Sequence, residues 1–282
     1  MKTLQTPLLN TTVEEIFHKC VEGYTDEKRK NRLLGYTYII ERDTLLYEKK
    51  VPDQIHEFSP SRLPDDDASE ELRKVYTEKF ARKNSPGRKY YNEILSQTPN
   101  GVCPICGIRA VSTLDHYLPK SKIPTLSVTP SNLIPSCRDC NMDKQERMEL
   151  EPQKTPVHLY FDNIPADPWL YVEVGDKMEI TYFIECLPEW DAGLCCRLQN
   201  HLDTYKLGRV YSSHAAQIIT ENSRKWRRLL CVGGKQELRR DIAFTLDSLE
   251  NVDRNSWKTA LYRGLYKEID MLVNWLNDVA VD

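Results

Sequence analysis

The chain contains two Cys-x-x-Cys pairs, Cys103 with Cys106 and Cys137 with Cys140. Two residues between cysteines let a tight turn direct both sulfur atoms at one ion, and two such pairs satisfy tetrahedral zinc. The spacing therefore predicts a structural Zn²⁺ that holds these two parts of the chain together. Because four thiolates close the zinc coordination shell, no position is left for water, and any catalysis must use another metal.

A second set of polar residues lies between and beside the cysteine pairs: Asp115, His116, Asn132 and Asn141. A carboxylate, an imidazole and an amide oxygen suit a hard cation and a proton acceptor that together hydrolyse a phosphodiester. An isolated Asp-His pair is more commonly a capped turn or a core histidine. Its position between two zinc pairs favours the catalytic interpretation.

The run TLDHYLPKSKIPTLSVTPSNLIPSCRDCNMDK, residues 113–144, resembles the core of the HNH endonucleases, the ββα-metal nucleases. The letters of that family fall on His116, Asn132 and Asn141, so the third position is Asn in this chain rather than His. Zinc-stapled members carry an Asn directly after the last zinc cysteine, and Asn141 follows Cys140 in the same way. The resemblance thus implies the zinc-stapled variant of the fold.

The same resemblance implies a phosphodiester hydrolase that acts on nucleic acid, with double-stranded DNA as the expected substrate. His116 would be the general base, because an imidazole with a pKa near ~6.5 is mostly neutral at neutral pH. Asp115 and Asn141 would ligate one catalytic Mg²⁺ or Mn²⁺. Asn132 would order the loop between the strands and thereby orient the base.

A basic segment precedes this motif. Between Leu72 and Lys89 there are seven basic residues and one acid, with aromatic residues interleaved. Such a segment either binds phosphates or forms the solvated face of a helix whose aromatic side chains enter the core, and the sequence leaves both readings open. We predict nucleic-acid contacts from Arg82, Lys83, Arg88, Lys89, Lys120 and Lys144.

Length and composition indicate an ordinary globular protein, with 282 residues, 40% apolar residues and a net charge of −3. No apolar run reaches the roughly eighteen residues of a membrane span, and the N-terminus lacks a signal peptide's apolar region. We therefore expect a cytoplasmic location and no membrane partner. The cysteines outside the zinc pairs are expected to be buried or inert thiols; these are Cys20, Cys186, Cys195, Cys196 and Cys231.

Hydrophobic periodicity predicts a helical N-terminal region (1–98) and a β-hairpin followed by helices (153–282). Between them, the resemblance implies a ββα-metal nuclease core with zinc (99–152), so the expected class is α+β. In the first region Thr12 and Glu15 form a capping box, a helix is expected through 32–48, and Ser69 is expected to cap the basic helix. In the core, strands are expected at 111–117 and 132–136 and a helix from Cys137 to about Glu149.

In the last region we expect hairpin strands at 169–174 and 178–185 around Gly175-Asp176, and helices at 192–207, 209–232, 235–249 and 256–279. His158, in the run PVHLYFDNI, is expected to be a packing residue. The helical C-terminal region is a candidate surface for docking a partner protein.

The order of the regions resembles HNH proteins encoded beside ABC-type or AAA-type ATPases in bacterial anti-phage defence systems, the Septu type in particular. That resemblance implies a nuclease effector working with an ATPase partner. Two non-enzymatic alternatives stay open: a zinc-ribbon module that binds nucleic acid or protein without cutting, and a structural subunit with an inactive nuclease fold. Only the enzyme requires His116.

Overall fold

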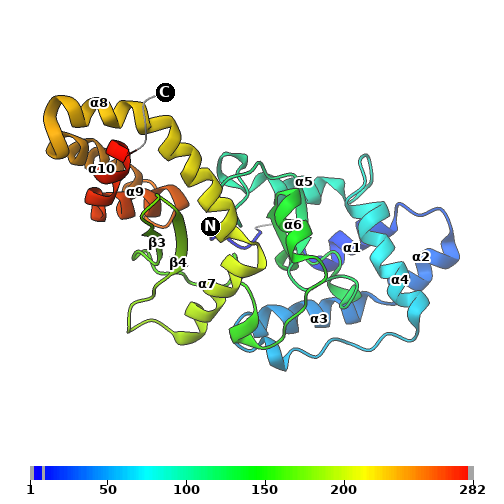
Figure 1. The fold of residues 1–282 in the computed structure, drawn as a ribbon. Coiled ribbons are helices and arrows are strands. Elements are labelled where there is room, and N and C mark those ends of the chain that lie inside the picture. Colours follow the sequence, from blue (N-terminus) through cyan, green and yellow to red (C-terminus); the bar gives the residue numbers. More distant parts are fainter. Residues whose placement is uncertain (1–2, 8–9, 279–282) are drawn as a thin grey trace. The chain divides into compact units, whose positions relative to one another are not determined.

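The computed structural model describes residues 3–7 and 10–278 (Figure 1). The chain forms two compact units, Lys2–Asn163 and Ile164–Asp282. The boundary predicted between residues 98 and 99 falls inside the first unit. There, apolar residues from the helical region, such as Tyr76 and Phe80, share one buried cluster with Leu114 and Leu133 of the predicted core strands. The predicted α+β class is confirmed.

Among the described residues of the first unit, five α-helices precede the zinc pairs: α1 (Val13–Val21), α2 (Glu27–Leu34), α3 (Thr37–Lys50), α4 (Asp66–Lys74) and α5 (Arg88–Ser96). The predicted capping box begins α1, since Thr12 and Glu15 exchange side-chain to backbone hydrogen bonds. The helix expected through 32–48 is interrupted after Leu34. Gly35 and Tyr36 separate α2 from α3 there.

The prediction that Ser69 caps the basic helix is wrong. Asp65 is the N-cap of α4, and its carboxylate accepts a hydrogen bond of 2.7 Å from the Ala68 N–H. Asp is as good an N-cap as Ser, and it comes earlier in the chain. After Lys74 the helix widens into a π-helix, η2 (Val75–Phe80). Such π-helical turns are rare, and they frequently occur at functional sites.

The predicted nuclease core contains two short antiparallel strands and one helix: β1 (Thr113–His116), β2 (Leu133–Ser136) and α6 (Arg138–Lys144). In the pairing register Asp115 lies opposite Ile134, and His116 lies opposite Leu133. The helix is shorter than predicted, because Gln145 adopts a φ of 54° and ends it. The segment between the strands contains only 3₁₀ turns, at 124–126 and 130–132.

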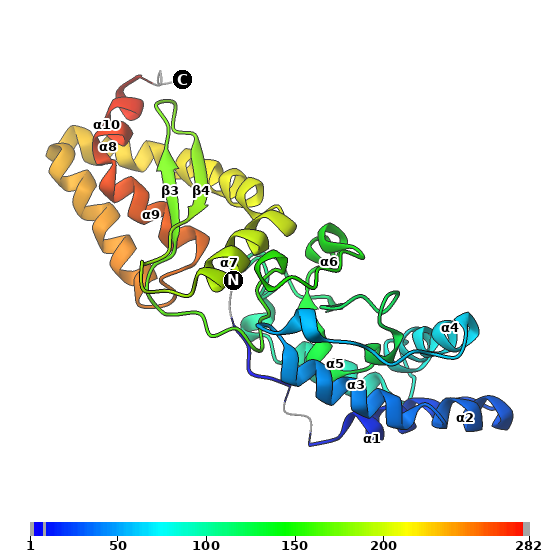
Figure 2. The same ribbon diagram turned by 90° about the horizontal axis from the view of Figure 1, so that it is seen from below.

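The second unit begins with the predicted hairpin, β3 (Leu170–Val174) and β4 (Ile180–Ile184). Four helices follow: α7 (Ala192–Thr204), α8 (Leu207–Glu250), α9 (Trp257–Lys267) and α10 (Ile269–Asp278). The predicted break at Gly233-Gly234 is a kink inside α8, where Gly234 has a φ of 66°. Figure 2 shows α9 beside β3. A Cβ atom on Gly264 would lie 2.1 Å from Val172 Cγ2, so this close packing requires glycine.

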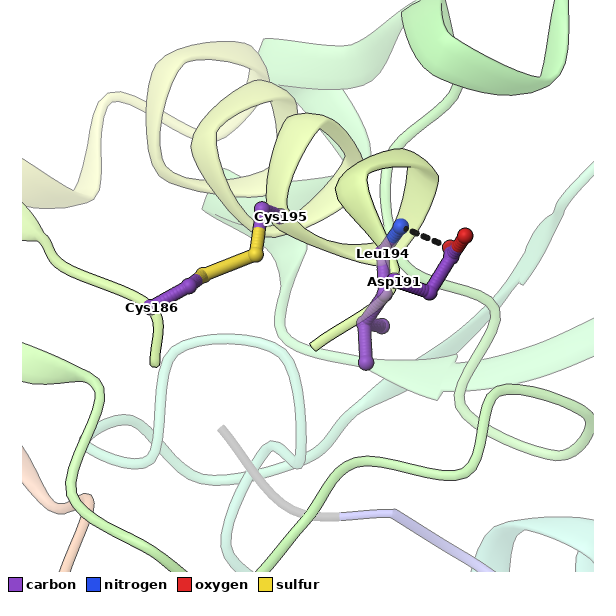
Figure 3. Close-up of a disulfide and its surroundings, with 4 residues drawn as sticks. All are labelled: Cys186, Asp191, Leu194 and Cys195. Carbon is purple, nitrogen blue, oxygen red and sulfur yellow. Dashed lines mark hydrogen bonds between the residues drawn. A yellow bond between two sulfur atoms is a disulfide. The ribbon is translucent and has the colours of Figure 1, made fainter. Parts of the chain in front are cut away.

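Cys186 and Cys195 form a disulfide (Figure 3), which corrects the expectation that both are free thiols. Asp191 caps α7 by accepting a hydrogen bond from the Leu194 N–H, and the first turn of that helix carries Cys195. The two Cα atoms are 6.2 Å apart, within the usual range for a disulfide. The pairing depends on how the segment after β4 folds back, and the spacing of the cysteines does not encode that path. Among the described residues, Cys20, Cys196 and Cys231 are free outside the zinc pairs.

None of the helices in the part of the chain that the structure describes has the length and apolar character needed to cross a membrane.

Candidate active site

The four predicted zinc cysteines converge in the first unit. All four are buried, and their sulfur atoms lie within 4.8 Å of one another. The first pair sits in a turn where the Gly107 N–H donates to the Cys103 carbonyl at 2.8 Å. In the second pair, Cys137 is the N-cap of α6, and its sulfur accepts from the Cys140 N–H. Tetrahedral zinc with Zn–S bonds of about 2.3 Å separates its sulfurs by about 3.8 Å, so the cluster fits this ion.

Because the four sulfur atoms lie so close together, the thiols change one another's pKa values. Contact with Cys103 lowers the pKa of Cys106, and it lowers that of Cys137 to about 6. Contact with Cys106 raises the pKa of Cys103, and contact with Cys103 raises that of Cys140. Four buried thiolates repel one another unless a cation neutralises them. The donor set and its geometry are therefore those of a four-cysteine zinc site.

Asp115 and Lys144 form a buried ion pair between β1 and α6. The Lys144 ammonium lies 3.4 Å from each carboxylate oxygen of Asp115, and it also donates to the His116 main-chain carbonyl. Burial raises the pKa of Asp115 to about 6, and the nearby ammonium opposes that rise. The Oδ2 atom is close to the ammonium but outside hydrogen-bond geometry, and no described residue donates a hydrogen bond to it. This buried, unsatisfied carboxylate oxygen fits a ligand for a hard cation.

His116 is held on two sides. Its Nε2 atom lies 2.9 Å from the Ser127 carbonyl oxygen, and the ring meets the Tyr76 ring edge-on with centroids 4.4 Å apart. Among the described residues, Nδ1 has no hydrogen-bond partner. Burial lowers the pKa of His116 to about 3, so the ring is neutral at neutral pH. The negative charge of a phosphate near the ring would favour the protonated form and raise that pKa again.

Asn132 is the last residue of the segment that links β1 to β2. Its Oδ1 accepts from the Leu118 N–H at 2.8 Å, and its Nδ2 donates to the carbonyls of Leu118 and Leu126 at 3.0 and 3.2 Å. The side chain is fully buried. All these partners are backbone atoms of the linking segment, so the contacts suit a residue that orders this segment.

Asn141 lies on the side of α6 that faces β1. Its Nδ2 is 3.4 Å from the Thr113 hydroxyl, and Thr113 shares a strand face with Asp115, because residues two apart point the same way. Lys144, one turn after Asn141, contacts Asp115 itself. The structure thus brings the amide of Asn141 and the carboxylate of Asp115 to neighbouring positions of one strand face, with Lys144 beside them.

The predicted nucleic-acid-binding residues differ in their environments. Lys144 is buried, while the Lys120 ammonium lies 5.6 Å from the centroid of the Tyr76 ring. Arg88 donates to Asn92 and to the Ala81 carbonyl and stacks on Tyr91. The exposed residues of this set are Arg82, Lys83 and Lys89. Of the described side chains, none forms an ion pair with Arg82 or Lys83.

Three contacts of the site were not predicted from the sequence. The Ser127 carbonyl is a backbone group, so no residue type marks it. Tyr76 stood out only as an aromatic residue within the basic segment. Thr113 carries a detectable signal, since it lies two residues before Asp115 and therefore on the same face of the strand.

Comparison with known proteins identifies the class. Residues 103–147 match the family model described as HNH endonuclease. The chain therefore contains an HNH endonuclease domain, and its four cysteines have a zinc-site arrangement. This finding confirms the resemblance drawn from residues 113–144.

Two curated proteins are similar to this chain. Protein ea31 of Escherichia phage lambda is 27% identical over 235 residues, which are 77% of this chain and 79% of that protein. The Septu protein PtuB of Bacillus thuringiensis is 31% identical over 93 residues, 30% of this chain and 34% of that protein. The second match supports the resemblance to Septu systems over part of the chain. No solved structure matches.

Proposed function

We propose that this chain is a metal-dependent endonuclease that hydrolyses phosphodiester bonds of double-stranded DNA, with His116 as the general base. The observation that carries the proposal is the contact between His116 Nε2 and the Ser127 carbonyl oxygen. A carbonyl oxygen only accepts hydrogen bonds, so Nε2 must carry the ring proton. In a neutral ring Nδ1 then keeps its lone pair, and it is the atom that takes a proton from the attacking water.

Asp115 and Asn141 would supply the oxygen ligands of a Mg²⁺ or Mn²⁺ ion. When bound, such an ion stabilises charge on the phosphate and on the departing 3′ oxygen. The unsatisfied Oδ2 of Asp115 supports the assignment, and the Asn141 amide presents a carbonyl oxygen without adding charge. Lys144 holds the Asp115 carboxylate in place between β1 and α6. Asn132 would orient the base through the linking segment.

The test is cleavage of supercoiled plasmid by the purified protein with Mg²⁺ or Mn²⁺, compared with His116→Ala. We expect the substitution to slow cleavage by at least about a hundredfold, the usual contribution of a general base. The zinc content should be unchanged, because His116 is not among the four cysteines. His56→Ala is the matched control, since His56 is exposed and lies outside the site.

Equal cleavage by wild type and His116→Ala would exclude His116 as the base. An absence of cleavage by both proteins, with zinc bound, would favour the non-catalytic zinc module. Parallel reactions on double-stranded RNA and single-stranded DNA test the preference for double-stranded DNA.

We further propose that the nuclease is the effector of an anti-phage defence system and works with an ATPase partner. The similarity to the Septu protein PtuB supports this role. The helices of the second unit would provide the docking surface. An ATPase gene beside the gene for this chain would support the proposal, whereas a neighbouring methyltransferase gene would favour restriction. Phage infection of cells carrying the gene with its neighbours, in wild-type and His116→Ala forms, tests the role itself.

A further inference from the structure

One side of α3 faces the segment that links β1 to β2. The Thr44 hydroxyl lies 2.8 Å from the Thr129 hydroxyl, and the Glu48 carboxylate accepts from the Ser131 hydroxyl at 2.7 Å. A third contact comes from Asp43, whose carboxylate accepts from the Thr125 hydroxyl at 2.7 Å. The helical N-terminal region is therefore bonded at three places to the segment that closes the nuclease site.

Asp43 is the centre of this contact. Its side chain has no exposed surface, and a buried carboxylate is tolerated only when its charge is compensated. The compensation is nearly complete. The Ser61 N–H lies 3.0 and 2.9 Å from the two carboxylate oxygens, the Ser61 hydroxyl donates at 2.7 Å, and Arg42 pairs at 2.9 Å. Thr125 is the one partner that belongs to the nuclease core.

The contact made by Asp43 is close to the base. Thr125 lies in the 3₁₀ turn at 124–126, and Ser127, two residues later, provides the carbonyl that bonds His116 Nε2. The three bonds from α3 reach positions 125, 129 and 131, so they hold the chain on both sides of Ser127. Asn132 holds the same segment from within, through its bonds to Leu118 and Leu126.

We propose that Asp43 is a positioning residue of the nuclease site, which acts through Thr125 to hold the Ser127 carbonyl against His116 Nε2 and so fixes the ring tautomer. The inference rests on the proposed function and deepens it. Asp43 touches neither the substrate nor the reacting atoms. Its effect is to keep His116 Nδ1 unprotonated and oriented to take the proton from the attacking water. The set of elements that supports the chemistry would then include α3, about seventy residues before the HNH motif.

Thr125→Val is the decisive variant, because it exchanges a hydroxyl for a methyl group of similar size and removes only the bond to Asp43. Thr98→Val is the matched control. Thr98 is also buried in the first unit, but its hydroxyl bonds the Leu95 carbonyl, away from the linking segment. Asp43→Asn keeps the shape of the carboxylate and tests the same link from the other side.

Two measurements are made on each variant. The first is the tautomer of His116 from its ring ¹⁵N chemical shifts, which requires no enzymatic activity. The second is cleavage of double-stranded DNA, with kcat and KM determined separately. We expect Thr125→Val to populate the Nδ1–H tautomer and to lower kcat by about tenfold, a fraction of the contribution of a general base, while KM is unchanged. Thr98→Val should match wild type in both measurements.

A folded Thr125→Val protein with the wild-type tautomer and wild-type kcat would overturn the inference. So would equal shifts of the tautomer in Thr125→Val and Thr98→Val. If Asp43→Asn does not fold, Thr125→Val decides alone. If wild type does not cleave nucleic acid, the proposed function fails, while the tautomer measurement still reports whether Asp43 and Thr125 position the ring.

Discussion

Lys144 provides the positive charge that pairs with Asp115 in the site. Its ammonium is the cation that the structure places against the Asp115 carboxylate, and both side chains are buried. Removal of one partner from a buried ion pair leaves an uncompensated charge. We therefore expect Lys144→Met to destabilise the protein by about 3 kcal/mol, measured by urea unfolding.

The same variant should respond to divalent ions more strongly than wild type. Without the ammonium, an added Mg²⁺ becomes the cation that compensates Asp115, so Mg²⁺ should raise the unfolding midpoint more in Lys144→Met. Lys74→Met is the control, because Lys74 pairs with Glu70 at the surface and should change the stability little. Equal Mg²⁺ effects in the two variants would argue against a cation at Asp115.

His158 supplies a pH-dependent contribution to stability outside the site. The ring is fully buried, its Nε2 lies 2.8 Å from the Tyr47 hydroxyl, and its Nδ1 accepts from the Tyr160 N–H at 3.3 Å. Burial lowers the pKa of His158 to about 3. Below pH 6.5 His158 therefore binds a proton in the unfolded chain but stays neutral in the folded chain. The free energy of unfolding falls as the pH drops from 6.5 towards 3.

At pH 4.5 the buried, neutral His158 should lower the free energy of unfolding by about 3 kcal/mol relative to pH 7. His158→Gln removes the titrating group, so its loss of stability between pH 7 and pH 4.5 should be smaller by that amount. Urea unfolding of both proteins at the two pH values measures the difference. Identical losses would mean that His158 does not resist protonation. The expectation that His158 is a packing residue is consistent with its burial among aromatic rings.

At the scale of elements, the turn from η2 into α5 presents a group of exposed basic residues. Arg82 and Lys83 are exposed, while Lys79 and Arg88 of the same segment bond main-chain carbonyls. We predict that Arg82→Ala with Lys83→Ala weakens DNA binding and makes the dependence of log K on log salt less steep by about 2. Titrations at several salt concentrations measure this slope.

Lys19→Ala with Lys30→Ala is the control, because it removes the same charge from residues that are paired with Glu22 and Glu27. A slope that falls equally in both double variants would indicate a general charge effect. An unchanged slope in Arg82→Ala with Lys83→Ala would remove these two residues from the interface.

Elements with strong periodic or capping signals were predictable from the sequence. The capping box of α1, the hairpin around Gly175 and the helical character of the second unit follow from local patterns. The single helix expected at 256–279 is divided at Glu268 into α9 and α10. The N-cap of α4 was predicted wrongly because Asp65 and Ser69 are both suitable N-cap residues. The end of α6 depends on the backbone conformation of Gln145, a residue type with no preference for positive φ. The π-helix also has no sequence signature that periodicity could detect.

At the scale of the whole molecule, the HNH motif could be predicted because the spacing of metal ligands is local in the sequence. The contacts that support the motif come from distant parts of the chain and could not be predicted. The bonds from α3 to the linking segment join residues more than eighty positions apart, as between Asp43 and Thr125 or Thr44 and Thr129. A single sequence contains no record of such pairs. The disulfide between Cys186 and Cys195 was missed for a different reason: the two cysteines are nine residues apart, but the fold of the intervening turn brings them together, and their spacing does not encode that turn.

The proposed mechanism requires that Asp115 and Asn141 hold one divalent cation beside His116. The direct measurement is an anomalous difference map from crystals of the zinc-loaded protein soaked in Mn²⁺. We expect a manganese peak at about 2.0–2.3 Å from oxygen atoms of Asp115 and Asn141, separate from the zinc among the four cysteines. A map with zinc at the cysteines, no manganese near Asp115, and Lys144 still paired with that carboxylate would contradict it.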